Sequence, residues 1–236
     1  MSYLDTSTGS VVSHASGDER AGFIRRTFMH LAGAIAVFAL LESYLLSSGL
    51  GEKALVLLGQ SKWSWLVVMA AFMGVSILAD KWARDDYSPA IQYVGLGVYI
   101  VAFAVICLPM IYMATRFAPG VLENAAMITG GLVAGLCLVA FTTKKDFSFL
   151  GPILGMAFMI ALAVIVASII FGFQLGMFFS LIMIVFSAGS ILYSLSNIMH
   201  VYRTDQHVAA SLSLFSSIGL LFWYVMQFLM SMAGGD

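Results

Sequence analysis

The sequence predicts an all-α integral membrane protein built as a bundle of seven transmembrane helices. Hydrophobic residues make up 61% of the 236-residue chain and charged residues only 10%, whereas soluble proteins carry about 25% charged residues. The apolar runs are about twice as long as the roughly ten residues of a membrane β-strand, and they lack its alternation of polar and apolar positions. Helices, which satisfy their backbone hydrogen bonds internally, are therefore the expected spanning elements.

Charged residues divide the chain into seven apolar segments, each long enough to cross about 30 Å of hydrocarbon at 1.5 Å per residue. The expected spans are residues 27–48, 63–79, 90–115, 122–141, 149–173, 175–199 and 208–233. The weakest division lies between the fifth and sixth spans, where only a short segment with Gly172 and Gly176 interrupts the apolar run. Paired glycines are typical of a tight turn, so we expect a helical hairpin there.

Residues 1–22 precede the first span and are rich in Ser, Thr and Gly. They lack the continuous apolar stretch of a removable secretion signal, so the first helix is expected to act as its own insertion signal. They also carry too few apolar side chains to offset the entropy of ordering. The sequence therefore predicts a mobile cytoplasmic tail over residues 1–22 and a single transmembrane domain over residues 23–236.

The Lys and Arg residues of the short connections predict the orientation of the bundle. With the N-terminus inside, eight of them fall on the cytoplasmic side and three on the outer side, as the positive-inside rule requires. The eight are Arg20, Arg25, Arg26, Lys81, Arg84, Lys144, Lys145 and Arg203, and the three are Lys53, Lys62 and Arg116. Seven crossings then place the C-terminus on the periplasmic side.

Several function classes find no support in the sequence. Cys107 and Cys137 both fall inside expected spans, where free cysteine behaves as a small hydrophobic residue, and no set of residues has metal-ligand spacing. We therefore expect neither a metal nor a cofactor. The formal charge of −1 provides no basic stripe for nucleic acid. The chain also lacks the G-x-S-x-G, H-E-x-x-H and G-x-x-x-x-G-K motifs, which favours a non-enzymatic protein.

Polar residues follow one face of each of the last two spans, at separations of three, four and seven residues. In the sixth span these are Ser180, Ser187, Ser190, Ser194 and Asn197, and in the seventh they are Ser213, Ser217, Tyr224, Gln227 and Ser231. Two interpretations remain open. The stripes either pack two helices together through small residues and interhelical hydrogen bonds, or they line a hydrated path for a solute.

Glu42 is the acidic residue that lies clearly within a span, towards the outer end of the first one. A carboxyl group at that depth needs a partner, a proton or access to water. No Lys or Arg is expected at matching depth. A proton-sensing or cation-binding role and a structural role, with the side chain reaching outward or bonding to a Ser or Tyr, are both compatible with this position.

Three segments resemble a known family. Residues 142–151, with Lys144, Lys145, Asp146 and Ser148, closely resemble the T-T-x-K-D-x-S-F-L-G signature of the transmembrane Bax inhibitor motif family. Residues 191–200 resemble the S-N-I-I-H end of the sixth helix in its bacterial YccA-like branch, and residues 210–215 the A-T-x-S-L-Y start of the seventh. The motifs cover roughly residues 120–232, and the first half of the chain matches by span count and loop length.

The resemblance implies a fold in which the seventh helix is central and the other six surround it. The signature loop has two interpretations, a structural role and a binding role, and local mechanics favour the structural one. Independently of the family, an aspartate placed like Asp146, just before a helix, can accept a hydrogen bond from a free N–H group and meets the positive end of the helix dipole.

The resemblance further implies that this chain lacks an acid pair. Family members studied as calcium-leak channels carry one acid on the sixth helix and one on the seventh, and the matching positions here are Ser194 and Ser217. Two hydroxyl groups cannot exchange a proton near neutral pH or balance the charge of a divalent ion. Calcium conduction gated in this way is therefore not expected.

Members of the YccA-like branch associate with the membrane-anchored ATP-dependent protease FtsH and its partners HflK and HflC. The resemblance thus implies a bacterial inner-membrane protein that modulates this protease as a slowly processed client, whose tail the protease engages. Two alternatives stay open: a leak channel or carrier for calcium, protons or small solutes, and an accessory subunit of a larger membrane complex.

Overall fold

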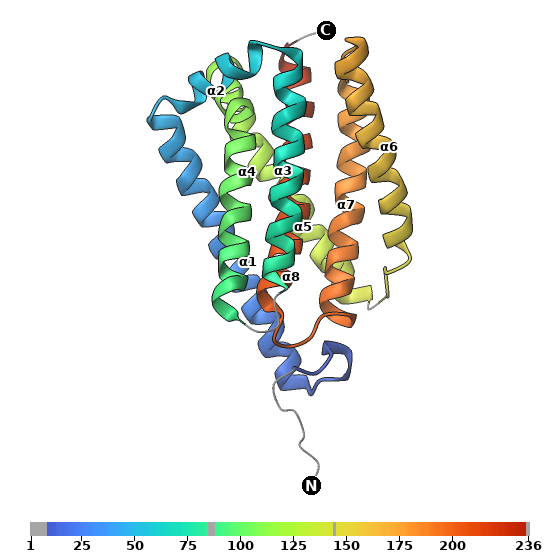
Figure 1. Cartoon of the computed structure of the whole chain (residues 1–236). Coiled ribbons are helices and arrows are strands. Elements are labelled where there is room, and N and C mark those ends of the chain that lie inside the picture. Colours follow the sequence, from blue (N-terminus) through green and yellow to red (C-terminus); the bar gives the residue numbers. More distant parts are fainter. Residues whose placement is uncertain (1–8, 85–87, 144, 235–236) are drawn as a thin grey trace.

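A computed structural model describes residues 9–84, 88–143 and 145–234 of the chain (Figure 1). A short 3₁₀ helix, Val12–His14, precedes eight α-helices in the described residues. These are α1 Gly17–Ser47, α2 Leu50–Gly59, α3 Lys62–Ala83, α4 Pro89–Phe117, α5 Val121–Thr143, α6 Leu150–Phe171, α7 Met177–His200 and α8 His207–Gly234. All but α2 are long and apolar enough to cross a membrane, which confirms the prediction of seven spans and an all-α membrane fold.

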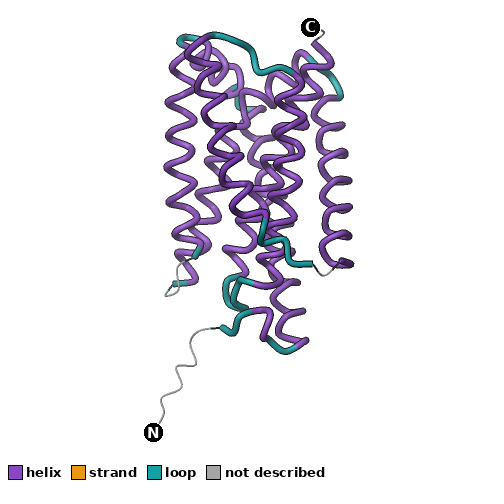
Figure 2. Tube along the Cα trace, turned by 90° about the vertical axis from the view of Figure 1, so that its right-hand side faces the viewer, coloured by secondary structure: helices purple, strands orange, loops and turns teal. Residues whose placement is uncertain are grey.

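The seven long helices stand side by side and give the bundle two ends (Figures 1 and 2). The end that carries the N-terminal segment is called the N-side here, and the opposite end, where α8 finishes, the C-side. The ends of α3, α5 and α7 and the starts of α4, α6 and α8 lie on the N-side. The α6–α7 connection lies on the C-side, where Gly172 adopts a left-handed conformation with φ +75° and ends α6, as the hairpin prediction requires.

The short helix α2 was not expected from the sequence, because the apolar run between the first two spans is too short to cross the bilayer. Its first turn packs closely on α4, because a Cβ atom at Gly51 would lie 2.7 Å from the ring of Tyr112. Its charged residues Glu52 and Lys53 remain exposed. α2 is thus a ten-residue cap on the C-side and too short to span the bilayer.

α8 is the central helix, as the family resemblance implied. It contacts α1, α3, α4, α5 and α7, whereas α6 packs chiefly against α7 at the periphery. In its most apolar window 67% of the residues are buried, compared with 11% in α6. The close approach of α4 and α8 depends on Gly219, because a Cβ atom there would lie 2.6 Å from the ring of Phe103.

The N-terminal segment differs from the predicted mobile tail over residues 9–22. Ser16 caps α1 in a capping box with Glu19, so the helix already begins at Gly17. Ahead of it, Val11 forms an antiparallel bridge with Arg203 of the α7–α8 connection, and the N–H of Val12 donates to Tyr202 O at 2.9 Å. Val12 is fully buried. One buried valine and a few backbone hydrogen bonds to a loop distant in sequence hold this segment, which local composition does not reveal.

Candidate functional site

Ser194 and Ser217, which the family resemblance led us to expect at the positions of an acid pair, lie in contact between α7 and α8. Ser194 Oγ is 3.1 Å from Ser217 Oγ and 3.3 Å from Ser213 Oγ. The Ser217 hydroxyl also donates to the backbone oxygen of Ser213 at 3.1 Å. Ser194 and Ser217 are buried, with exposed fractions of 4% and 8%. These three side chains, called the serine cluster here, satisfy one another without an ionisable group.

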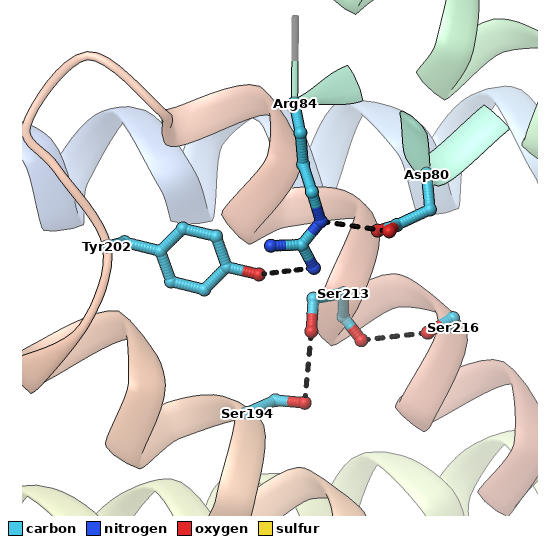
Figure 3. A network of polar contacts seen from close by, with 6 residues as sticks. All are labelled: Asp80, Arg84, Ser194, Tyr202, Ser213 and Ser216. Carbon is cyan, nitrogen blue, oxygen red and sulfur yellow. Dashed lines mark hydrogen bonds and ion pairs between the residues drawn. The ribbon is translucent and has the colours of Figure 1, made fainter. Parts of the chain in front are cut away.

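An ion pair lies beside the serine cluster at the N-side end of α3 (Figure 3). Arg84 Nε donates to Asp80 Oδ2 at 2.9 Å, and Arg84 Nη2 donates to Tyr202 Oη at 3.3 Å. The guanidinium group also lies over the Tyr202 ring, 5.5 Å from its centroid. Arg84 therefore ties the end of α3 to the connection between α7 and α8.

A pocket of about 340 Å³ adjoins this ion pair, because Asp80 lines it. It is lined by Ser76, Ile77, Asp80, Tyr99, Leu212, Ser213 and Ser216. Hydroxyl groups from α3, α4 and α8 therefore face a shared space, with one carboxylate at its edge. The apolar side chains of Ile77 and Leu212 line the same pocket, so its wall is mixed rather than purely polar.

The sequence did not single out Asp80 or Tyr202. Arg84 entered the sequence analysis only as one of the positive charges that predict the orientation of the bundle. The i, i+4 spacing of Asp80 and Arg84 on one helix was a usable signal for their pairing. No such signal connects Tyr202 to them, because it lies 118 positions beyond Arg84. The pocket likewise depends on which faces α3, α4 and α8 turn towards one another.

The family signature loop lies between α5 and α6 and is hydrogen-bonded to α7. Asp146 Oδ1 accepts hydrogen bonds from the N–H of Ser148 at 2.8 Å and from Ser196 Oγ of α7 at 2.9 Å. The N–H of Phe147 donates to the same Ser196 hydroxyl. Asp146 thus accepts from a free N–H, as expected, but α6 begins only at Leu150 and Phe149 occupies its N-cap position. The carboxylate closes a turn and ties the loop to α7.

These contacts set the electrostatics of the loop. The hydrogen bond from the Ser148 N–H, with that from the Ser196 hydroxyl, holds the pKa of Asp146 below its ordinary value. Lys145 is exposed, and Lys144 lies outside the described residues. Ser196 is 1% exposed and was not part of the predicted stripe, although it belongs to the second family motif.

The remaining stripe residues are not brought together into one site. Ser187 is buried and donates to the oxygen of Met183 in its own helix at 2.7 Å. Tyr224 packs edge-on against Phe179, with ring centroids 6.0 Å apart. Ser190, Asn197 and Gln227 are partly buried. Within the stripes, only the serine cluster forms side-chain hydrogen bonds between α7 and α8 in the described residues.

Glu42 lies near the C-side end of α1, in the other half of the bundle. It is 4% exposed, and neither carboxyl oxygen has a hydrogen-bond partner among the described residues. The described residues contain no group of three or more His, Cys, Asp and Glu side chains that could hold a metal ion. Cys107 and Cys137 are free thiols.

Comparisons with known proteins agree with this architecture. The family model described as Inhibitor of apoptosis-promoting Bax1 matches residues 20–234. An uncharacterized protein of Pseudomonas aeruginosa is 28% identical over 173 residues, which cover 72% of this chain and 75% of that protein. Protein LIFEGUARD 3 of Arabidopsis thaliana is 23% identical over 232 residues, 92% of this chain and 87% of that protein. The Modulator of FtsH protease YccA of Escherichia coli K12 is 34% identical over 112 residues, 46% of this chain and 51% of that protein.

Proposed function

The chain belongs to the Bax inhibitor-one family, and from this premise we propose that it is a non-enzymatic protein that binds and modulates a membrane-anchored protease of the FtsH type. The similarity to the FtsH modulator YccA, over about half of each chain, supports this direction. The observation that carries the proposal is the serine cluster, because the helix pair that would hold an acid pair is closed here by hydroxyl groups bonded to one another.

Residue chemistry explains why the serine cluster favours a binding role over an ion valve. A pair of carboxyl groups changes its net charge with pH, whereas Ser194 and Ser217 stay neutral over the physiological range. Their hydrogen bonds also replace the interactions that a permeating cation would need. The helix pair is therefore suited to hold α7 and α8 together in a compact bundle.

We place the protein in a bacterial inner membrane with its N-side facing the cytoplasm. The described residues Arg20, Arg25, Arg26, Lys81, Arg84, Lys145 and Arg203 all belong to the N-side, in the arrangement that the positive-inside rule associates with the cytoplasm. The C-side would then face the periplasm. A cysteine introduced at exposed Glu52 should react with a membrane-impermeant maleimide on intact spheroplasts, and one at Lys145 should react only after lysis.

As a mechanism, we propose that the protease processes this protein slowly. An ATP-driven protease must pull a client from one end, and the N-terminal segment is available on the cytoplasmic side in this orientation. The contacts of Val11 and Val12 with the α7–α8 connection would then resist the first step of extraction. While the client occupies the protease, other membrane substrates cannot bind it, so their turnover falls.

The binding proposal predicts co-purification. A C-terminally tagged full-length chain, solubilised gently from native membranes, should bring down FtsH together with HflK and HflC. Overproduction should lengthen the half-life of another FtsH membrane substrate. Absence of the protease from the purified material, together with unchanged substrate half-life, would reject the proposal.

The client mechanism predicts that release of the N-terminal segment accelerates degradation. Val12→Asp places a charge in a fully buried site, whereas Ser13→Asp changes its exposed neighbour. In cells that contain FtsH, the half-life of the Val12→Asp chain should fall and that of the Ser13→Asp chain should not. Equal half-lives, or a fall that persists in cells without the protease, would contradict the mechanism.

A leak path is the second candidate, because of the hydroxyl-lined pocket beside Asp80 and Arg84. It predicts a flux of protons or small polar solutes in proteoliposomes that Ser213→Leu and Ser216→Leu reduce by filling the pocket. Liposomes with the wild-type chain that leak calcium, protons and glycerol no faster than empty liposomes would remove this candidate.

A further inference from the structure

The Glu42 side chain points from α1 into the protein core. Phe38, Glu42 and Leu46 follow one another at intervals of four residues, so they share one face of the helix. Phe38 and Leu46 pack against the buried core, and Glu42 itself is 96% buried, as its exposed fraction of 4% shows. The carboxyl group therefore cannot reach the headgroup region by extending along the lipid surface.

Aromatic residues fix what surrounds this carboxyl group. The Phe38 ring centroid lies 5.4 Å from that of Phe103 on α4 and 6.5 Å from that of Phe222 on α8. All three helices run from the N-side to the C-side. One turn further towards the C-side, the same helix faces carry Glu42 on α1, Cys107 on α4 and Met226 on α8. Cys107 and Met226 are fully buried. The carboxyl group is therefore enclosed at this level by a thiol and apolar side chains.

No charged side chain neutralises Glu42 within the described part of the chain. On α4, the residue one turn beyond Phe103 is the fully buried Cys107, and Arg116 lies further along, over the ring of Tyr112 at 5.8 Å. On α2, Glu52 and Lys53 are exposed. On α8, the described segment contains no acidic or basic residue beyond His207, at the opposite end of the bundle. On α1 itself, Tyr44 is exposed and His30 bonds to Tyr93 on the N-side.

A carboxylate in such a site would be a buried, unpaired charge, whereas the neutral acid costs only its missing hydrogen bonds. The closed packing of α1 therefore requires a proton on Glu42. We propose that Glu42 is a proton-binding site of the bundle, and that release of this proton loosens the contact of α1 with α4 and α8. The site is separate from the serine cluster and from protease binding, because it lies in the C-side half of the bundle.

The native thiol of Cys107 reports on this site, so no cysteine has to be introduced. It is fully buried beside Glu42, so an alkylating reagent reaches it only when α1 moves away. Cys137 is partly exposed on α5 and serves as an internal standard in the same molecule. The ratio of the two labelling rates removes the general rise in thiol reactivity with pH.

The experiment uses the full chain in liposomes of phosphatidylethanolamine and phosphatidylglycerol, treated with N-ethylmaleimide between about pH 6 and pH 9. Mass spectrometry of the peptides gives the Cys107 to Cys137 ratio. If opening requires the loss of one proton, each rise of one pH unit increases the population of open molecules by up to about tenfold. For the wild type we expect the ratio to rise about tenfold or more, and for Glu42→Gln, which keeps the shape of the neutral acid, we expect a flat profile.

Glu42→Met provides a second variant that removes all polarity from the site and should also give a flat profile. Wild-type and Glu42→Gln profiles that coincide would overturn the proposal, and so would a wild-type ratio that does not change with pH. Neither outcome affects the protease proposal, because Glu42 takes no part in it.

Discussion

The serine cluster and the Glu42 site are two buried polar regions in opposite halves of one bundle, and they solve the same physical problem differently. In the serine cluster, Ser194 and Ser217 lie 3.1 Å apart, and Ser217 also bonds to a backbone oxygen of its own helix. A serine can always turn to the carbonyl three or four residues earlier, so burial of its hydroxyl group costs little.

A carboxyl group has no such internal partner. Its oxygens need donors, and the helix backbone around Glu42 offers none, because its N–H groups are already bonded. Glu42 therefore needs a proton or water to be stable in its site, whereas the serine cluster satisfies its hydrogen bonds within α7 and α8. Polar residues in the same bundle thus differ in whether their environment can change their charge.

The largest expected effect comes from a permanent charge at the Glu42 site. Glu42→Lys replaces a group that can become neutral by one that is cationic in water, and we expect it to lower the free energy of unfolding by about 3–5 kcal/mol. Glu42→Gln should stay within about 1 kcal/mol of wild type, because it keeps the shape of the neutral acid. Unfolding in mixed dodecylmaltoside and SDS micelles measures both. Similar values for Lys and Gln would mean that this site is wet.

The next effect concerns Phe103, which packs against Phe38 next to Glu42 and touches α8 at Gly219. Gly219→Ala places a methyl group 2.6 Å from the Phe103 ring, and such overpacking typically costs about 1–3 kcal/mol. Gly33→Ala is the control, because its Cβ would meet no atom within 4 Å; it should be neutral or should stabilise the helix by up to about 1 kcal/mol. Equal effects in the same micelle assay would show that α4 and α8 are not in close contact there.

The serine cluster should respond weakly to the loss of its hydroxyl groups. Interhelical hydrogen bonds in membrane proteins average about 0.6 kcal/mol and reach about 1.7 kcal/mol. A double-mutant cycle of Ser194→Ala and Ser217→Ala should therefore give a coupling energy in this range. A coupling of several kcal/mol would indicate an ionised or metal-bound group between the two helices and would break the comparison with Glu42.

The sequence predicted the parts of the fold that depend on local composition. Seven spans, the helical hairpin at Gly172 and the burial of Cys107 follow from hydropathy and from glycine chemistry. The central place of α8 came from the family resemblance, since its polar stripe alone is equally typical of a peripheral helix. α2 was missed because its ten residues are too few for a span and include the charged Glu52 and Lys53. Its place depends on the close contact of Gly51 with Tyr112 of α4.

The site was predictable only in part, for a geometric reason. The family resemblance paired Ser194 with Ser217 in advance, and the polar stripes predicted on the last two spans were compatible with that pairing. Tyr202 and Val12 could not, because each acts through a contact between segments distant in sequence. The sequence predicted that Glu42 has no basic partner. The expected alternative of an outward-reaching side chain or a bond to a Ser or Tyr is not found among the described residues, where Glu42 is 4% exposed and without a hydrogen-bond partner.

The smallest expected effect lies in the signature loop, where the acid, unlike Glu42, is exposed and accepts two hydrogen bonds. The pKa of Asp146 is lowered in the folded chain by the Ser148 N–H and the Ser196 hydroxyl. The carboxylate therefore stabilises the fold at every pH above its unfolded pKa of about 3.9, and this contribution is lost as the pH falls through the lower folded value. Asp146→Asn should lower the thermal midpoint slightly at pH 7, and the difference from wild type should vanish in strong acid. Ser196→Ala removes one donor, so the loss of the stabilisation by the carboxylate should move closer to pH 4. A difference between Asp146→Asn and wild type that persists in strong acid would assign Asp146 a role independent of its charge.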